Sequence, residues 1–87
     1  MTILDFWAPW CGPCKSFAPI LDKVATERNL EVVKVNIEDD TEELAIRHAI
    51  RSVPTIVVVN EDGEEIGRFV GTKSENDFNE FLDKISE

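Results

Sequence analysis

The chain of 87 residues is predicted to adopt an α/β fold, a four-stranded mixed sheet with helices on both faces in the order β-α-β-α-β-β-α. Three observations support this fold class. The first strand, Ile3 to Trp7, is apolar on both faces, which is typical of a strand inside a covered sheet. A helical stretch follows, and a right-handed crossover makes the next strand parallel to the first. Two strands near the C-terminus are separated by a tight turn and form an antiparallel hairpin.

Periodicity defines the elements of the first half of the chain. Apolar residues recur at helical spacing from Cys14 to Val24, which predicts a helix that runs to about Arg28. Pro19 lies inside this helix and should kink it. Residues 31–37 alternate less strictly but are rich in valine, and we expect them to form the second strand.

A short helix is expected next. Asp40 and Glu43 are three residues apart and resemble a capping box, which predicts a helix that continues through His48. We interpret His48 as a solvated residue of this helix. The many acidic residues of the helices are most simply explained as solvated faces.

The C-terminal third contains the hairpin and the last helix. Residues 55–60 are β-branched and predict a strand, and Asp62-Gly63 marks the turn into a strand over residues 65–70. Gly71 should end that strand, and Ser74 should cap the last helix. The apolar stripe of this helix is formed by Phe78, Phe81, Leu82 and Ile85.

Length and net charge exclude several classes of protein. The 87 residues are enough for one small domain, which we expect to span residues 1–87. A net charge of −9 argues against binding to nucleic acid or to an anionic membrane. No segment approaches the roughly 18 apolar residues of a membrane span, and the N-terminus does not resemble a signal peptide. We therefore expect a cytoplasmic protein.

The two cysteines, Cys11 and Cys14, allow three interpretations. A structural zinc site needs four ligands, and beyond the cysteines the chain offers only His48. A structural disulfide across so short a loop would constrain the unfolded chain little. A redox pair is favoured, because Cys11 lies where a strand meets a helix, and the free N–H groups of the first helical turn stabilise a thiolate. Cys11 should then be the exposed nucleophile and Cys14 the more buried, resolving thiol.

The motif "FWAPWCGPCK", followed by "SVPT" and "GEEIGRFVG", closely resembles the thioredoxin family over nearly the whole chain. The resemblance implies a thioredoxin-like fold that lacks the usual N-terminal strand and helix. It also implies a protein-disulfide reductase that acts by dithiol–disulfide exchange and needs no cofactor or metal. The expected partners are disulfide-containing proteins and a separate thioredoxin reductase as electron donor. We expect a monomer, with the exposed sheet edge as a route to weak dimerisation.

Two charged residues are assigned roles through this resemblance. From the residues alone, Asp5 is either buried within an apolar strand or placed at a frayed strand end. The resemblance implies that Asp5 lies beneath Cys14, has a raised pKa and exchanges a proton with that thiol. Lys34 matches the family's lysine that faces this carboxyl and tunes it. Lys34 is equally well explained as a charge that protects an edge strand from association.

The resemblance also implies a docking surface for substrates. The Val53–Pro54 bond is expected to be cis and to lie against the redox pair, so that the backbone of Val53 pairs with an extended substrate segment. Trp10 should be exposed beside Cys11, and Trp7 should pack under the active-site loop. The remaining expected site residues are Gly12, Pro13, Thr55, Val70 and Gly71.

Two alternatives remain open at this point. A glutaredoxin-like, glutathione-dependent reductase would share the fold, but the dipeptide Gly12-Pro13 differs from the Tyr- or Phe-containing dipeptide that is typical of that family. A thioredoxin fold that serves as a binding subunit without using its thiols is the second alternative. Because Pro13 places no cation beside Cys11, the reducing direction is favoured.

Overall fold

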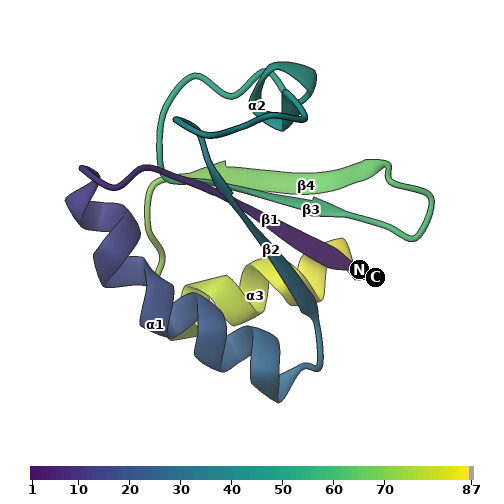
Figure 1. Cartoon of the computed structure of the whole chain (residues 1–87). Coiled ribbons are helices and arrows are strands. Elements are labelled where there is room, and N and C mark those ends of the chain that lie inside the picture. The colour runs from purple at the N-terminus through teal and green to yellow at the C-terminus, as the bar shows by residue number, and fades with distance from the viewer. Residues whose placement is uncertain (87) are drawn as a thin grey trace.

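The computed structural model describes residues 1–86 and contains the predicted elements in the predicted order (Figure 1). The elements are β1 (Thr2–Trp7), α1 (Gly12–Glu27), β2 (Glu31–Asn36), α2 (Leu44–Arg47), β3 (Thr55–Val59), β4 (Glu65–Val70) and α3 (Glu75–Ile85). Most predicted boundaries agree within two residues, and α1 continues through Pro19. Among residues 1–86, none of the helices combines the length and apolar character needed to cross a bilayer.

The sheet has the strand order β2-β1-β3-β4. β1 is parallel to β2 and antiparallel to β3, and β3 pairs with β4 as the antiparallel hairpin. β1 and β3 therefore lie in the interior of the sheet, which agrees with the apolar character of both of their faces. β2 is an outer strand, as one interpretation of Lys34 expected.

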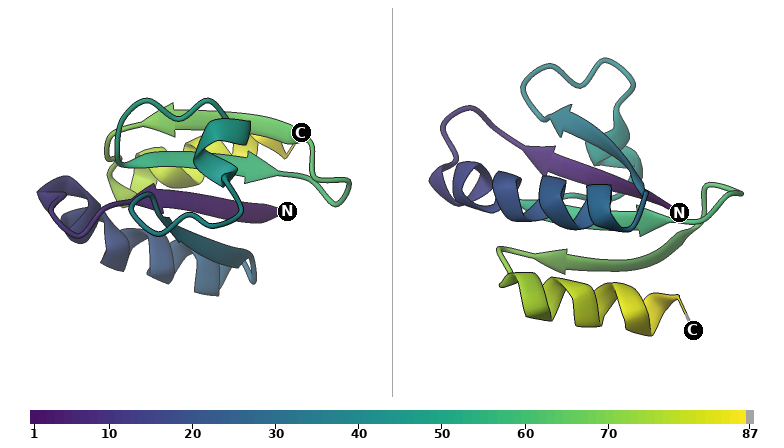
Figure 2. Two further views of the ribbon diagram at one scale, coloured as in Figure 1. Left: turned by 45° about the horizontal axis from the view of Figure 1, so that its top comes forward. Right: turned by 90° about the horizontal axis from the view of Figure 1, so that it is seen from below.

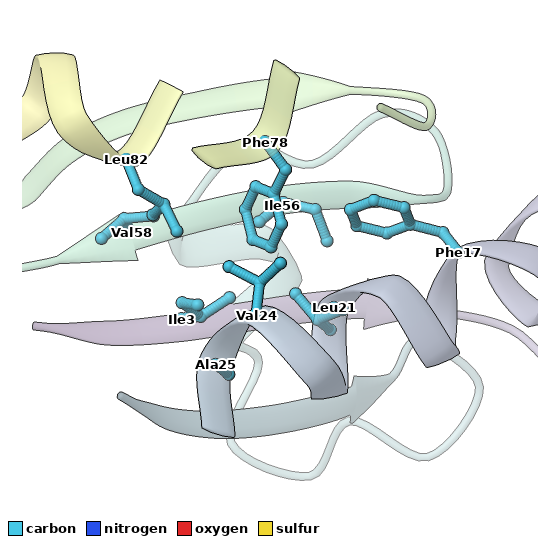
Figure 3. Close-up of a cluster of buried hydrophobic side chains, with 9 residues drawn as sticks. All are labelled: Ile3, Phe17, Leu21, Val24, Ala25, Ile56, Val58, Phe78 and Leu82. Atoms are coloured by element: carbon cyan, nitrogen blue, oxygen red, sulfur yellow. The ribbon is translucent and has the colours of Figure 1, made fainter. Parts of the chain in front are cut away.

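Helices cover both faces of the sheet (Figures 1 and 2). α1 and α3 lie on one face, where their apolar stripes meet alternate residues of β1 and β3 (Figure 3). The buried cluster on this face consists of Ile3, Phe17, Leu21, Val24, Ala25, Ile56, Val58, Phe78 and Leu82. This cluster anchors α1, whose first turn carries both cysteines.

The opposite face of the sheet is covered by α2 and its flanking loops. Its buried cluster consists of Leu4, Phe6, Val35, Val57 and Val59. The side chains that α2 contributes to it, Leu44 and Ala45, are only partly buried. The alternation between the two clusters along β1 and β3 follows the two-residue period of a strand.

The expected capping box before α2 is wrong in its details. Asp40 does cap the segment, because its two carboxylate oxygens accept hydrogen bonds from the amides of Leu44 (3.0 Å) and Ala45 (2.8 Å). Glu43 is the residue before the helix, but it has a left-handed backbone with φ of 56° and makes no capping bond. Asp40 therefore caps the helix from outside it, and α2 begins at Leu44 and spans only Leu44–Arg47.

The interpretation of His48 as a solvated helix residue is also wrong. His48 is the C-terminal cap of α2 and is partly buried, with its ring 6.0 Å from that of Phe6. Its Nδ1 lies 3.5 Å from a carboxylate oxygen of Glu65, and its carbonyl accepts a hydrogen bond from Arg68 (2.6 Å). These contacts tie the end of α2 to β4, which helical spacing alone could not indicate.

Candidate active site

The two cysteines lie at the start of α1. Cys11 is the residue that caps the helix, and Gly12 and Pro13 form its first two positions. Proline is compatible with this first turn because the helix needs no hydrogen bond from its nitrogen there. Cys11 and Cys14 form a disulfide, with their Cα atoms 5.3 Å apart. One helical turn therefore brings the two sulfurs together.

The helix start favours negative charge on the Cys11 sulfur. The backbone amide of Cys14 donates a hydrogen bond to Sγ of Cys11 at 3.2 Å. The positive end of the helix dipole lies at the same position. In the reduced protein the same groups stabilise a thiolate, the form that attacks disulfides.

The burial of the two cysteines differs from the expectation. Cys11 was expected to be exposed and Cys14 sheltered, but their exposed fractions are 4% and 7%. The sulfur of Cys11 is turned inward, where it is bonded to Cys14 and accepts that residue's amide hydrogen. Cys14 in turn lines a hollow beside the sheet. In this disulfide form, burial therefore does not distinguish the two thiols.

Three segments of the chain enclose the redox pair. Ala8, Cys11 and Cys14 form a small buried cluster, against which Trp7, Ile37 and Val53 pack. Trp7 thus lies under the active-site loop, as expected. The Val53–Pro54 bond is cis, as the resemblance implied, and the carbonyl of Pro54 accepts a hydrogen bond from the amide of Gly71 at 2.9 Å.

Asp5 is buried near Cys14, with 6% of the residue exposed. It lines a hollow of about 180 Å³ between α1 and the strands β1 and β2, together with Trp7, Cys14, Lys15, Ala18 and Lys34. Burial raises the pKa of Asp5 to about 6, because the charged form loses hydration. Lys34 opposes this rise in pKa, and Asp22 adds to it. A carboxyl with this pKa can gain or lose a proton near neutral pH.

Lys34 combines features of both interpretations. It lies on the outer strand β2, directly opposite Asp5 in the parallel pairing with β1, and lines the same hollow. Its ammonium nitrogen is 3.2 Å from Oδ2 of Asp22 on α1, so the salt bridge that it makes is with Asp22. The charge of Lys34 therefore lies close to Asp5 while being held at the surface.

Of the expected docking residues, Trp10 and Val70 are exposed, whereas Val53 and Gly71 are partly buried and Pro54 is buried. Trp10 is 66% exposed, and its indole nitrogen donates a hydrogen bond to Oε2 of Glu38 at 2.9 Å. Val70 is also exposed, and Gly71 follows it with φ of 90°. A second hollow, of about 160 Å³, is lined by Trp10, Ile37, Ala45, Ile50, Arg51, Ser52 and Val53.

Thr55 does not belong to the exposed part of this surface. Only 1% of Thr55 is accessible, and its hydroxyl donates a hydrogen bond to the carbonyl of Ser52 at 2.7 Å. The expected role of Thr55 in substrate binding stays a prediction, and the hydrogen bond of its hydroxyl spans the turn that contains Val53 and Pro54.

Sequence reasoning missed three residues that complete the site. Glu38 holds Trp10, Arg51 lines the second hollow, and Asp22 pairs with Lys34. Only Asp22 had a usable signal, because it lies eight residues after Cys14 and thus on the same side of α1. Within residues 1–86, the structure gathers no group of three or more His, Cys, Asp or Glu side chains suited to a metal ion.

Comparisons with known proteins agree with this geometry. Residues 1–84 match the Thioredoxin family model. The chain is 38% identical to thioredoxin from Bacillus subtilis over 86 residues, which cover 97% of this chain and 81% of that protein. It is 39% identical to thioredoxin 1 from Synechococcus elongatus over 84 residues, which cover 94% of this chain and 77% of that protein.

A solved structure shows the same fold. A mutant thioredoxin from Halobacterium salinarum superposes with a TM-score of 0.86 and 30% identity, covering 99% of this chain and 74% of that one. These matches are to thioredoxins, so the glutaredoxin-like alternative and the redox-inactive binding subunit are not favoured. The chain belongs to the thioredoxin family, and its Cys11–Cys14 pair is the redox-active disulfide of a thiol–disulfide oxidoreductase.

Proposed function

We propose that the chain transfers electrons to disulfide-containing proteins, with Cys11 as the nucleophile and Cys14 as the resolving thiol. The observation that carries this proposal is the position of Cys11 at the start of α1, where the amide of Cys14 donates to its sulfur. The resemblance to thioredoxins supports the reducing direction. Gly12 and Pro13 add no cation that would stabilise the reduced form further.

In the first step, the Cys11 thiolate attacks one sulfur of the substrate disulfide. A mixed disulfide forms between Cys11 and the substrate, and the other substrate sulfur leaves as a thiolate that takes a proton from water. The reaction needs a reduced protein, so the disulfide seen here is the product state.

In the second step, Cys14 attacks the sulfur of Cys11. The Cys11–Cys14 disulfide forms, and the second substrate sulfur leaves as a thiolate, so that two electrons have passed to the substrate. The thiol proton of Cys14 goes to Asp5, directly or through water in the hollow that both residues line. The pKa of about 6 for Asp5 suits a base that works near neutral pH.

Substrate docks beside the redox pair in this proposal. Among residues 1–86, Val53 makes no backbone hydrogen bond, and it packs against the cysteine cluster. An extended substrate segment can therefore pair with its amide and carbonyl as an added strand. Trp10, Val70 and Gly71 would form the apolar surroundings of that segment.

The remaining parts of the proposal concern the cellular setting. A separate thioredoxin reductase would return the Cys11–Cys14 disulfide to the dithiol. No bound cofactor is needed, because the two sulfurs carry both electrons. We propose that the chain works as a cytoplasmic monomer, supporting electron transport and cell redox homeostasis.

Cysteine variants of the whole chain test the assignment. Cys11→Ser should abolish reduction of insulin by the chain with a thioredoxin reductase and NADPH. Cys14→Ser should still attack but should accumulate a mixed disulfide, visible by mass spectrometry and reversed by dithiothreitol. Ser16→Ala, which changes an exposed residue on the same turn, is the control and should retain activity. Full activity of Cys11→Ser would refute the redox role.

The direction and the donor are tested separately. The reduction potential of the Cys11–Cys14 couple, measured against a glutathione buffer, should be clearly more negative than those of oxidising foldases. An oxidising potential would reverse the proposed direction. Turnover with glutathione but not with a thioredoxin reductase would contradict the proposed donor.

A further inference from the structure

The salt bridge between Lys34 and Asp22 joins the two walls of the hollow that contains Asp5. Lys34 lines the hollow from β2, and its nitrogen is 3.2 Å from the Asp22 carboxylate on α1. Cys14, Ala18 and Asp22 follow one another at four-residue intervals, so they share the side of α1 that faces this part of the sheet. Lys34 therefore lines the same hollow as Cys14, and its partner Asp22 lies about two helical turns along α1 from Cys14.

Among residues 1–86, the charges around Asp5 come from two of the elements that pack against it. β2 contributes Lys34, which is opposite Asp5 in the strand pairing. α1 contributes Asp22, Lys15 and the thiol of Cys14 when it is reduced. On the other side, β3 places the apolar Ile56 opposite Asp5. Lys34 is thus the cation that lies next to the buried carboxyl in the strand pairing.

Lys34 pairs with the exposed carboxylate of Asp22 and lies opposite the buried Asp5 in the strand pairing. Asp22 is exposed, so pairing there leaves the ammonium hydrated, whereas pairing with Asp5 would require burying it. A lysine released from Asp22 would turn towards Asp5 and favour its ionised form. Asp22 thus offers the Lys34 ammonium a hydrated partner, whereas Asp5 would offer it a buried one.

We propose that Asp22 is a positioning residue for proton transfer, because it holds the Lys34 ammonium at the rim of the hollow and away from the Asp5 carboxyl. This inference rests on the proposed role of Asp5 as the proton acceptor for Cys14. Asp22 does not touch the reacting atoms. It acts on the reaction through Lys34, by keeping Asp5 able to take up a proton near neutral pH.

The first test is the titration of Asp5 in the oxidised whole chain, followed by NMR of its carboxyl carbon. Asp22→Asn should lower the pKa of Asp5 from about 6 towards the ordinary value of 3.8. Glu27→Gln is the matched control, because it removes one negative charge from the same helix at its far end. The inference is overturned if Asp22→Asn shifts the pKa of Asp5 no more than Glu27→Gln does.

A second variant separates positioning from the charge of Asp22 itself. Lys34→Met should raise the pKa of Asp5, because it removes the cation that lowers it. In this background, Asp22→Asn should shift the pKa of Asp5 much less than it does in the presence of Lys34. An equal shift in both backgrounds would mean that Asp22 acts by its own charge, and would overturn the positioning role.

The pH profile of insulin reduction connects the inference to the reaction. With Asp22→Asn, the acidic limb of the profile should move to lower pH in parallel with the pKa of Asp5. If the pKa falls while the profile stays in place, Asp22 positions Lys34 as inferred, but Asp5 is not the proton acceptor. The two hypotheses therefore fail on different measurements.

Discussion

The face of the sheet under α1 and α3 is filled by fully buried side chains, whereas the face under α2 is closed by side chains that are only partly buried. On the first face, Phe17 and Phe78 pack edge to face with ring centres 5.4 Å apart. On the second, α2 contributes no buried residue, and Ile46 is 75% exposed. Fully buried apolar side chains and ion pairs such as Arg28–Asp83 hold α1 and α3. Partly buried apolar side chains and hydrogen bonds from Asp40 and Arg68 hold α2.

The redox site is built from segments that are attached to both faces of the sheet. The cysteines belong to α1 and are anchored by the well-packed face. Val53 belongs to the loop that follows α2 and packs on the face that α2 covers. The reacting thiols are therefore attached to the face with the more deeply buried side chains, and Val53 to the face whose covering side chains are only partly buried.

A matched pair of leucine truncations should show the largest difference between the faces. Leu82→Ala in α3 removes a fully buried side chain and should lower the free energy of unfolding by about 3 kcal/mol. Leu44→Ala in α2 removes a partly buried one and should lower it by about 1 kcal/mol. Urea unfolding of the oxidised chain measures both. Equal losses would contradict the contrast between the two faces.

Asp5 is a buried carboxyl on the face under α1 and α3, and its substitution should change stability in the opposite direction. Its folded-state pKa of about 6 exceeds the ordinary 3.8, so its contribution to stability is present below about pH 3.8 and is lost as pH rises through about 6. Asp5→Asn should therefore raise the free energy of unfolding at pH 7.5 by on the order of 3 kcal/mol.

Two comparisons sharpen this prediction. At pH 4 the stabilisation by Asp5→Asn should nearly vanish, because the folded protein then carries Asp5 in its neutral form. Asp62→Asn, at an exposed turn, should leave stability unchanged at both values of pH. Urea unfolding of the oxidised chain at pH 4 and pH 7.5 provides the measurement. A stabilisation that is independent of pH would refute the raised pKa.

On the face covered by α2, removal of the Asp40 cap should have a moderate effect on stability. Asp40→Ala removes both hydrogen bonds to the amides of Leu44 and Ala45 and should lower the free energy of unfolding by about 1 kcal/mol. Hydrogen exchange at these two amides should accelerate more than exchange in α1. Glu42→Ala, an exposed acidic neighbour, is the control. Unchanged exchange would mean that α2 is held mainly by its apolar contacts.

The smallest effect is expected at Ile46. Because this side chain is 75% exposed, Ile46→Ala should change the free energy of unfolding by no more than about 0.5 kcal/mol. Thermal unfolding followed by circular dichroism is sufficient. A loss above about 1 kcal/mol would show that α2 packs more deeply than its exposure indicates.

Much of the fold could be predicted because it depends on short-range patterns. The two-sided apolar strand at Ile3 to Trp7 and the stripe from Phe78 to Ile85 each indicate their own element. The turn at Gly63, with φ of 81°, and the cap at Ser74 are also local. These signals need no knowledge of partners, since each follows from the geometry of a strand, a helix or a turn.

Two of the errors concern side chains whose surroundings come from distant segments. His48 meets Phe6 and Glu65. The burial of Cys11 depends on the packing of Val53 and Ile37 around it. No pattern within a few residues carries this information, because these neighbours are 17 or more positions away.

By itself, the sequence determined the order of the elements and the redox pair at the start of a helix, because these depend on local spacing and on the chemistry of two thiols. Only the tertiary structure decided which charges meet around Asp5. The strand pairing sets Lys34 opposite Asp5, and the packing of α1 brings Asp22 to Lys34. The pKa of a buried carboxyl depends on such neighbours through space, so it follows from the fold as a whole.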